Sequence, residues 1–105
     1  MEKQYNVKRP NIPADIIRII KVEAGHKCSI KYCNEHTYLE IHHINQNRED
    51  NSVDNLILLC DKHHKMAHAN KIERKALEEY KKLLNIQIQH YEHIVSNNSG
   101  NFYSN

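Results

Sequence analysis

The sequence predicts a small α+β domain in which a two-stranded hairpin is followed by a helix. Three observations indicate this fold. The chain has 105 residues, which suits one domain with a modest core. Two short apolar segments, residues 38–44 and 56–60, have strand character and flank a polar loop. Apolar residues at helical spacing occur before and after them, over residues 12–25 and 72–95.

The chain is expected to begin with an arm, residues 1–11, followed by a helix over residues 12–25. Pro13 suits the first turn of this helix, Asp15 complements its dipole, and Gly25 favours a left-handed end. Four apolar residues fall on one stripe that we expect to be buried: Ile16, Ile17, Ile20 and Ala24.

The middle of the chain predicts a knuckle and a hairpin. Residues 26–36 have neither helical nor strand periodicity, and we expect an irregular knuckle there. Residues 38–44 alternate between apolar and polar side chains, as a half-buried strand does. Residues 45–55 are rich in Asn and Asp and predict a loop. The uninterrupted apolar run 56–60 predicts a fully buried second strand.

Two helices are predicted after the hairpin. The first covers residues 61–69, with Asp61 as its N-cap. The second is a long amphipathic helix over residues 72–95, about 35 Å in length at 1.5 Å per residue. Residues 96–105 are expected to form a disordered tail. The domain itself is therefore assigned to residues 12–95.

Composition restricts the setting and the partners. The N-terminal residues are polar and no apolar run has the length of a transmembrane helix, so we expect no secretory signal and no membrane span. Three cysteines, an odd number, argue against a disulfide framework and favour a reducing, intracellular compartment. A net charge of +2 permits a polyanionic partner without requiring one.

The cysteines and one histidine predict a structural metal site. Cys28 and Cys33 have the spacing C-x4-C, and Cys60 and His63 have the spacing C-x2-H. Each pair can bind one ion from a turn, and together they form a Cys3His tetrahedron. Thiolates favour zinc, so we expect a structural Zn2+. The alternative is that the cysteines are ordinary buried residues and that His63 lies on the surface.

Neighbouring histidines predict a second metal site of a different kind. His64 and His68 are four residues apart and share one helix face, whereas His63 points about 100° away. His42 and His43 end the first strand and point to opposite faces. With His42, His64 and His68 as ligands, an ion keeps open positions for substrate and water. The remaining imidazole can then act as a base, as a hydrolytic site requires.

The segments LEIHHIN, DNLILLC and HHKMAH resemble the HNH endonuclease family with its ββα-metal (His-Me finger) hairpin. The motif covers residues 39–68, and the cysteine framework extends the resemblance back to Cys28. The fold implied is a small ββα-metal hairpin with a zinc knuckle, an N-terminal helix and a long C-terminal helix. Many members carry two C-x2-C pairs. This chain departs from that pattern in its C-x4-C pair and in His63, which stands where a cysteine is usual.

The resemblance implies a role for each matching residue. His42 binds the catalytic metal, and His43 is the general base. Asn55 orders the loop that positions this base, and His64 and His68 complete the metal site. The activity implied is hydrolysis of phosphodiester bonds in DNA with one catalytic divalent ion: Mg2+, Mn2+, Ni2+ or Zn2+. A cytoplasmic protein of a bacterial or phage-infected cell is expected.

The implied partner is nucleic acid, most readily double-stranded DNA. Arg48, Lys62 and Lys65 flank the predicted site and are expected to contact phosphates weakly. Interspersed acidic residues leave a solvated surface as the alternative. The apolar stripe of the long helix leaves open a homodimer or a partner protein.

Two further alternatives belong to other classes of function. A non-catalytic zinc-knuckle module that binds nucleic acid or protein needs only the Cys3His set, and it leaves the other histidines without a role. A nuclease acting on RNA, or one kept silent until a partner delivers it, is the third hypothesis. Glu40 is either a partner of a ligand histidine or part of the solvent face of the strand, and we favour the solvent face.

Overall fold

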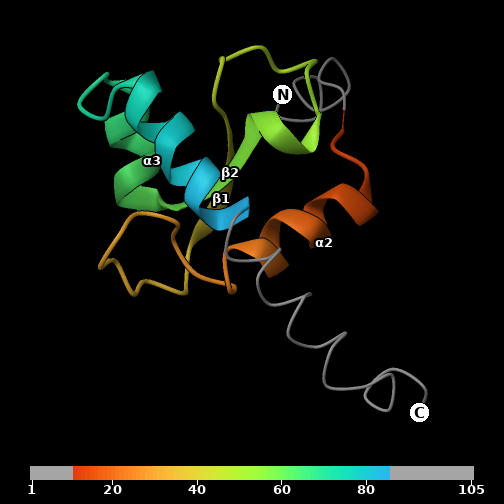
Figure 1. Ribbon diagram of the computed structural model, residues 1–105, viewed down its shortest axis with the longest axis horizontal. Helices are drawn as coiled ribbons and strands as arrows, with labels where there is room; N and C mark the ends of the chain where they lie inside the picture. The colour runs from red at the N-terminus through yellow and green to blue at the C-terminus, as the bar shows by residue number, and fades with distance from the viewer. Residues whose placement is uncertain (1–10, 86–105) are drawn as a thin grey trace, which may run out of the picture.

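The protein is described by a computed structural model over residues 11–85. The elements are α2 (Ala14–Glu23), β1 (Leu39–His43), the 3₁₀ turn η1 (Val53–Asn55), β2 (Leu56–Cys60) and α3 (Asp61–His68). The chain is helical again over residues 74–85, where the described part ends, and this segment is called the C-terminal helix below (Figure 1). The α+β class is confirmed, with two antiparallel strands and three helices among the described residues. Most of the predicted arm, the tail and the end of the long helix lie outside them.

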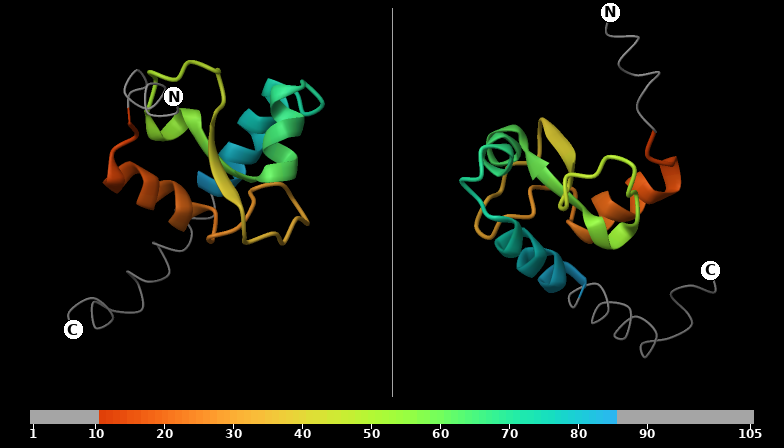
Figure 2. Two further views of the ribbon diagram at one scale, coloured as in Figure 1. Left: turned by 180° about the vertical axis from the view of Figure 1, so that it is seen from behind. Right: turned by 90° about the horizontal axis from the view of Figure 1, so that it is seen from above.

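The hairpin is covered by helices on both faces, which explains why β2 is buried along its whole length. Side chains alternate along a strand. Leu56 and Leu58 therefore pack in a cluster with Ile20 and Ala24 of α2. Ile57 and Leu59 point to the opposite face of β2. They pack in a second cluster with side chains of α3 and the C-terminal helix: Ala67, Leu77 and Leu84. Figures 1 and 2 show α2 and α3 on opposite sides of the strands.

Helix α2 is shorter than predicted by two residues at each end. Pro13 is the N-cap and not part of the first turn, because its ψ of 145° is extended. Its carbonyl accepts hydrogen bonds from two N–H groups of the first turn, both at 3.0 Å. Gly25 ends the helix with φ 70°, and the His26 N–H donates back to the Lys21 carbonyl at 2.8 Å. This is the left-handed end expected from the glycine.

Helix α3 follows β2 without a connecting loop. Cys60, the last strand residue, has an extended backbone and is therefore the N-cap. The prediction that Asp61 caps the helix is wrong, since Asp61 is the first helical residue and pairs with Lys65 at 3.2 Å. The helix ends at His68, one residue before the predicted end, and Asn70 turns the chain with φ 60°. Direct continuity with β2 fixes the orientation of this short helix.

A buried ion pair connects the two ends of the described chain. The Glu23 and Lys81 side chains, which are 5% and 3% exposed, pair between α2 and the C-terminal helix. Burial raises the pKa of Glu23 even though the Lys81 charge opposes the shift. Within residues 11–85, no helix combines the length and apolar character needed to cross a membrane.

Candidate functional site: two clusters of metal-ligating side chains

The structure brings the four residues of the predicted structural site together. The ligand atoms of Cys28, Cys33, Cys60 and His63 all lie within 4.8 Å of one another. His63 Nδ1 lies 3.2 Å from the Cys60 Sγ and 3.4 Å from the Cys28 Sγ. Two such ligands on one tetrahedral zinc are about 3.5 Å apart, given bonds of about 2.3 and 2.0 Å. These four side chains therefore form a candidate metal site.

Backbone hydrogen bonds hold the knuckle against β2 so that its cysteines meet those of the helix start. The Ser29 N–H donates to the Leu58 carbonyl at 2.9 Å, and the Cys28 N–H donates to the Glu35 carbonyl at 2.9 Å. The Cys33 N–H closes a turn onto the Ile30 carbonyl at 2.9 Å. Two of the cysteines thus come from a knuckle anchored to β2, and the third ends that same strand.

The donor set of this cluster, three sulfurs and one imidazole, suits a soft divalent cation. Burial raises the pKa of Cys28 to about 12, so the thiol is protonated at neutral pH without a positive partner. Burial also lowers the pKa of His63, which keeps its ring neutral and able to ligate. A divalent ion would stabilise the thiolate directly, because metal binding and cysteine deprotonation are linked.

A second cluster consists of three imidazoles. His42, His64 and His68 have ligand atoms within 4.8 Å of one another. The ring centroids are 5.2 Å apart for His42 and His64, and 5.0 Å apart for His42 and His68. The Nε2 atoms of His64 and His68 lie 3.1 Å apart. Nitrogens bound to one tetrahedral ion at about 2.0 Å are separated by about 3.3 Å, so the spacing fits a shared ion.

Electrostatics keep this cluster ready for a cation. His42 is 2% exposed, and burial, followed by the neighbouring rings, lowers its pKa to about 4. Burial and the nearby His64 also lower the pKa of His68. A neutral imidazole presents a lone pair, whereas a protonated one cannot ligate. His42 is therefore neutral at physiological pH and requires no proton release before it binds an ion.

Glu40 is half exposed to solvent and also contacts this cluster, so it combines the two roles considered from the sequence. Its carboxylate accepts a hydrogen bond from His64 Nδ1. The alternation of β1 explains this contact, because Glu40 and His42 are two residues apart and point to the same face. Pairing at Nδ1 leaves His64 Nε2 directed at His68, as in sites where a carboxylate orients a ligand histidine.

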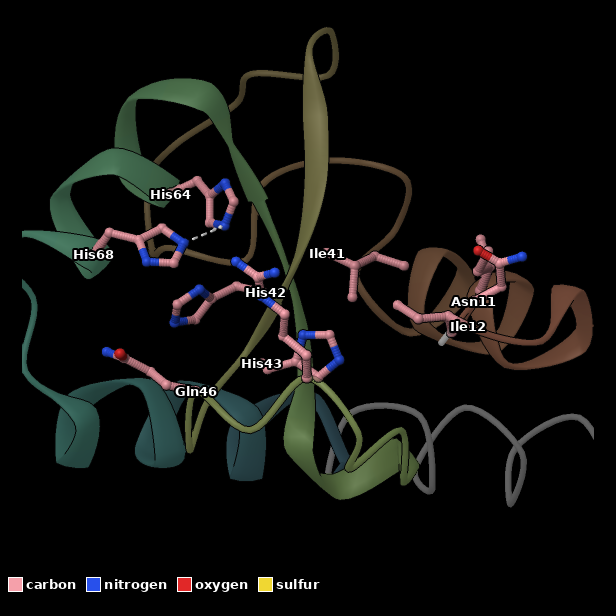
Figure 3. A pocket seen from close by; sticks show the side chains of 10 residues that line it. Asn11, Ile12, Ile41, His42, His43, Gln46, His64 and His68 are labelled. Carbon is pink, nitrogen blue, oxygen red and sulfur yellow. Dashed lines mark hydrogen bonds between the residues drawn. The ribbon is translucent and has the colours of Figure 1, made fainter. Parts of the chain in front are cut away.

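His43 points to the other face of β1 and stays outside the three-histidine cluster. Figure 3 shows the rings of His42, His64 and His68 gathered together while His43 projects away from them. The His43 Nε2 lies 2.8 Å from the Asn51 Oδ1, so the ring donates to the amide oxygen. Sequence reasoning missed Asn51, since it lies in an irregular loop where no periodicity indicates direction.

Asn55 ties together the two ends of the loop between the strands. It is 7% exposed, and its Oδ1 accepts the Asn45 N–H at 3.0 Å. Its Nδ2 donates to the Asn45 Oδ1 and to the Asp50 carbonyl, each at 2.9 Å. All these partners are loop atoms, and the direct contact with His43 is made by Asn51. Asn55 thus has the geometry to order the loop.

One cavity of about 810 Å³ is shared by the three-histidine cluster and His43. Arg48 and Gln46 line it beside the histidines, and aliphatic side chains form another part of its wall: Ile12, Ile17 and Ile41. Figure 3 shows Ile12 and Ile41 on the side away from the cluster. Lys62 and Lys65, both exposed on α3, are not among the described side chains that line it. Arg48 alone of the three predicted phosphate contacts therefore lies at the cavity.

The arrangement combines a candidate cation site, a separate imidazole and a cationic side chain around one opening. These groups can hold a divalent ion, accept a proton and attract an anion. No match was found when the chain was compared with models of known protein families, with curated proteins and with solved structures.

Proposed function

We propose that the chain is a metal-dependent endonuclease of the HNH type, in which the hairpin, α3 and their histidines form a ββα-metal site. The observation that carries the proposal is the separation of His42 from His43. His42 joins two other imidazoles at a candidate ion site, while His43 shares their cavity on the other strand face. A closed structural metal site does not require an unligated base beside it.

The substrate that fits this cavity is a phosphodiester. Arg48 lines the same cavity as His42, His64 and His68, so its charge is available to a phosphate near the cluster. A divalent ion held by His42, His64 and His68 would stabilise negative charge on the phosphoryl and leaving oxygens. Double-stranded DNA is the proposed substrate, with RNA as the alternative.

His43 supplies the base in the proposed reaction. Its ring takes a proton from a water molecule while the water oxygen forms a bond to phosphorus and the bond from phosphorus to the 3′ oxygen breaks. The ring nitrogen bonded to Asn51 carries a proton and is a donor, so the other nitrogen is the one available to accept. Asn55 contributes by holding the loop that contains Asn51.

We also propose zinc as the ion of the Cys3His cluster. Three thiolates with one imidazole match the soft, four-coordinate preference of Zn2+, and no donor position remains open. This site is proposed to hold the knuckle to the hairpin and to take no part in the chemistry.

Supercoiled plasmid incubated with the purified chain and Mg2+, Mn2+, Ni2+ or Zn2+ tests the proposal. The parent protein should nick or linearise the plasmid with at least one ion, and His43→Ala should lose at least about 100-fold in rate, since a general base contributes 10²–10⁴-fold. His36→Ala, a change at an exposed knuckle histidine, is the matched control and should cut at the parent rate.

The opposite outcomes are equally specific. If His43→Ala cuts at the parent rate, His43 is not the base. If the folded parent, loaded with zinc, cuts neither DNA nor RNA with any of these ions, the chain is better described as a zinc-knuckle module that binds nucleic acid or protein.

A further inference from the structure

We infer that Asn51 is a positioning residue that fixes the ring of His43 through its side-chain oxygen. The inference rests on the proposed function, because His43 matters only if it acts as the base. It assigns to Asn51 a task distinct from that of Asn55. Asn55 organises the loop backbone, and Asn51 makes the contact with the reacting imidazole.

The contact has the geometry of a specific hydrogen bond. Nε2 of His43 lies 2.8 Å from Oδ1 of Asn51, within the range of a good N–H to oxygen bond. Both side chains are half-buried, so water competes less than at an exposed position. The residues are eight positions apart and belong to different segments, β1 and the loop. The bond therefore connects a strand end to the returning loop.

The loop holds Asn51 in place through its neighbour Asp50. The Asp50 carbonyl accepts the Nδ2 bond of the buried Asn55, and its carboxylate accepts bonds from Asn45 Nδ2 at 3.0 Å and Ser52 Oγ at 2.7 Å. Hydrogen bonds to both its backbone and its side chain therefore hold Asp50, the residue before Asn51, in place. This network connects Asn55 to His43 by way of Asn51, so Asn55 should influence the base indirectly.

An amide oxygen is suited to this position because it only accepts. By accepting from Nε2–H it favours the neutral tautomer in which Nδ1 carries the lone pair. It also limits rotation of the ring about its bond to Cβ. Without an acceptor the ring can turn or bond to water through either nitrogen, and fewer molecules hold the lone pair towards the cavity.

Substitutions that keep or remove the acceptor test this role. Asn51→Leu should lower kcat at least about tenfold, the factor expected for losing one oriented hydrogen bond, with little change in KM for DNA or in metal content. Asn51→Asp keeps an acceptor oxygen and should retain most of the parent kcat. Glu49→Leu, at an exposed residue of the same loop, is the control and should leave kcat unchanged.

The indirect role of Asn55 can be tested in a second experiment, a double-mutant cycle with Asn51. If Asn55 acts through Asn51, the loss of kcat on adding Asn55→Ala to Asn51→Leu should be smaller than the loss on adding it to the parent. Full additivity of the two losses would overturn the connection between them.

A spectroscopic arm does not depend on activity. In zinc-loaded protein, proton NMR should resolve a slowly exchanging Nε2–H of His43 in the parent and in Asn51→Asp, and this signal should vanish in Asn51→Leu. Loss of kcat in Asn51→Leu without rescue by Asn51→Asp, or an unchanged Nε2–H signal in Asn51→Leu, would overturn the inference. A parent that shows the protected Nε2–H but cuts no nucleic acid would leave the contact standing and refute the nuclease proposal instead.

Discussion

Neighbouring histidines in this chain point to different places, and the local backbone determines which. On α3, successive residues are separated by about 100°, so His63 joins the cysteines while His64 faces the other cluster. On β1, successive residues point to opposite faces, so His42 joins the three-histidine cluster while His43 lies outside it and bonds to Asn51. Two backbone periodicities thus distribute two adjacent histidine pairs among the Cys3His cluster, the three-histidine cluster and a separate position bonded to Asn51.

Glu40 should control how tightly the three-histidine cluster holds an ion. Its carboxylate orients His64 through Nδ1 and makes the opposite nitrogen a better ligand. Glu40→Gln should therefore weaken divalent-ion affinity at this cluster by about 10- to 100-fold, the usual cost of losing such a partner. Isothermal titration calorimetry of zinc-loaded protein with Mn2+ or Ni2+ measures this affinity.

The matched control for Glu40 is Glu49→Gln, which removes a carboxylate from an exposed position in the loop. Affinity for the second ion should be unchanged in that variant. Equal affinities in Glu40→Gln and in the parent would show that the carboxylate contact does not orient a ligand.

At the scale of elements, α3 connects the two clusters. Its N-cap Cys60 and its first-turn residue His63 belong to the Cys3His cluster, while His64 and His68 belong to the other. The helix has only eight residues, and helices of this length are marginal without tertiary anchors. An ion at the Cys3His cluster would therefore hold the start of α3 and fix the direction in which His64 and His68 project.

Removing one ligand of the Cys3His cluster should also weaken the binding of an ion at the three-histidine cluster. Cys33→Ser leaves the three histidines intact, yet we expect the Mn2+ or Ni2+ affinity to fall at least about tenfold because α3 loses its anchor. Tyr32→Ala, at an exposed knuckle residue, is the control. An unchanged affinity for the second ion in Cys33→Ser would show that the two sites are independent.

At the scale of the whole molecule, a small core is supplemented by polar connections. The Glu23–Lys81 pair joins α2 to the C-terminal helix, but burial raises the pKa of Glu23, so desolvation outweighs the attraction of Lys81. Lys81→Met alone should cost about 3 kcal/mol of unfolding free energy, because it leaves a buried carboxylate unpaired. Replacing both residues, with Glu23→Leu added, should restore or exceed the parent stability in urea unfolding.

The exposed pair Arg74–Glu78 is the control for this prediction, and Arg74→Ala should cost about 0.5 kcal/mol or less of unfolding free energy.

Because the folded pKa of Glu23 is raised, the carboxyl group keeps its proton to a higher pH in the folded protein than in the unfolded chain. Stability of the parent should therefore decline as the pH rises from the ordinary glutamate pKa through the raised value, and Glu23→Leu should remove that decline. A double variant less stable than Lys81→Met would contradict this account.

Periodicity in the sequence suffices to predict the hairpin, both flanking helices and the sorting of histidines into two groups. These features depend on local geometry, which repeats every 2 or 3.6 residues. Asn51 and the Glu23–Lys81 pair depend on the path of a loop and on packing between distant helices, which leave no periodic trace. Glu40 lies between these cases: its parity with His42 places it on the face of the cluster, while its side chain stays half exposed to solvent.

The most direct test of the central claim is anomalous X-ray diffraction from crystals of zinc-loaded protein soaked in Mn2+ or Ni2+. Two peaks are expected. One should lie about 2.3 Å from the three thiolates, and the other about 2.0–2.2 Å from His42, His64 and His68, with His43 unligated and bonded to Asn51. A single peak, or a second ion ligated by His43 in place of His42, would contradict the account.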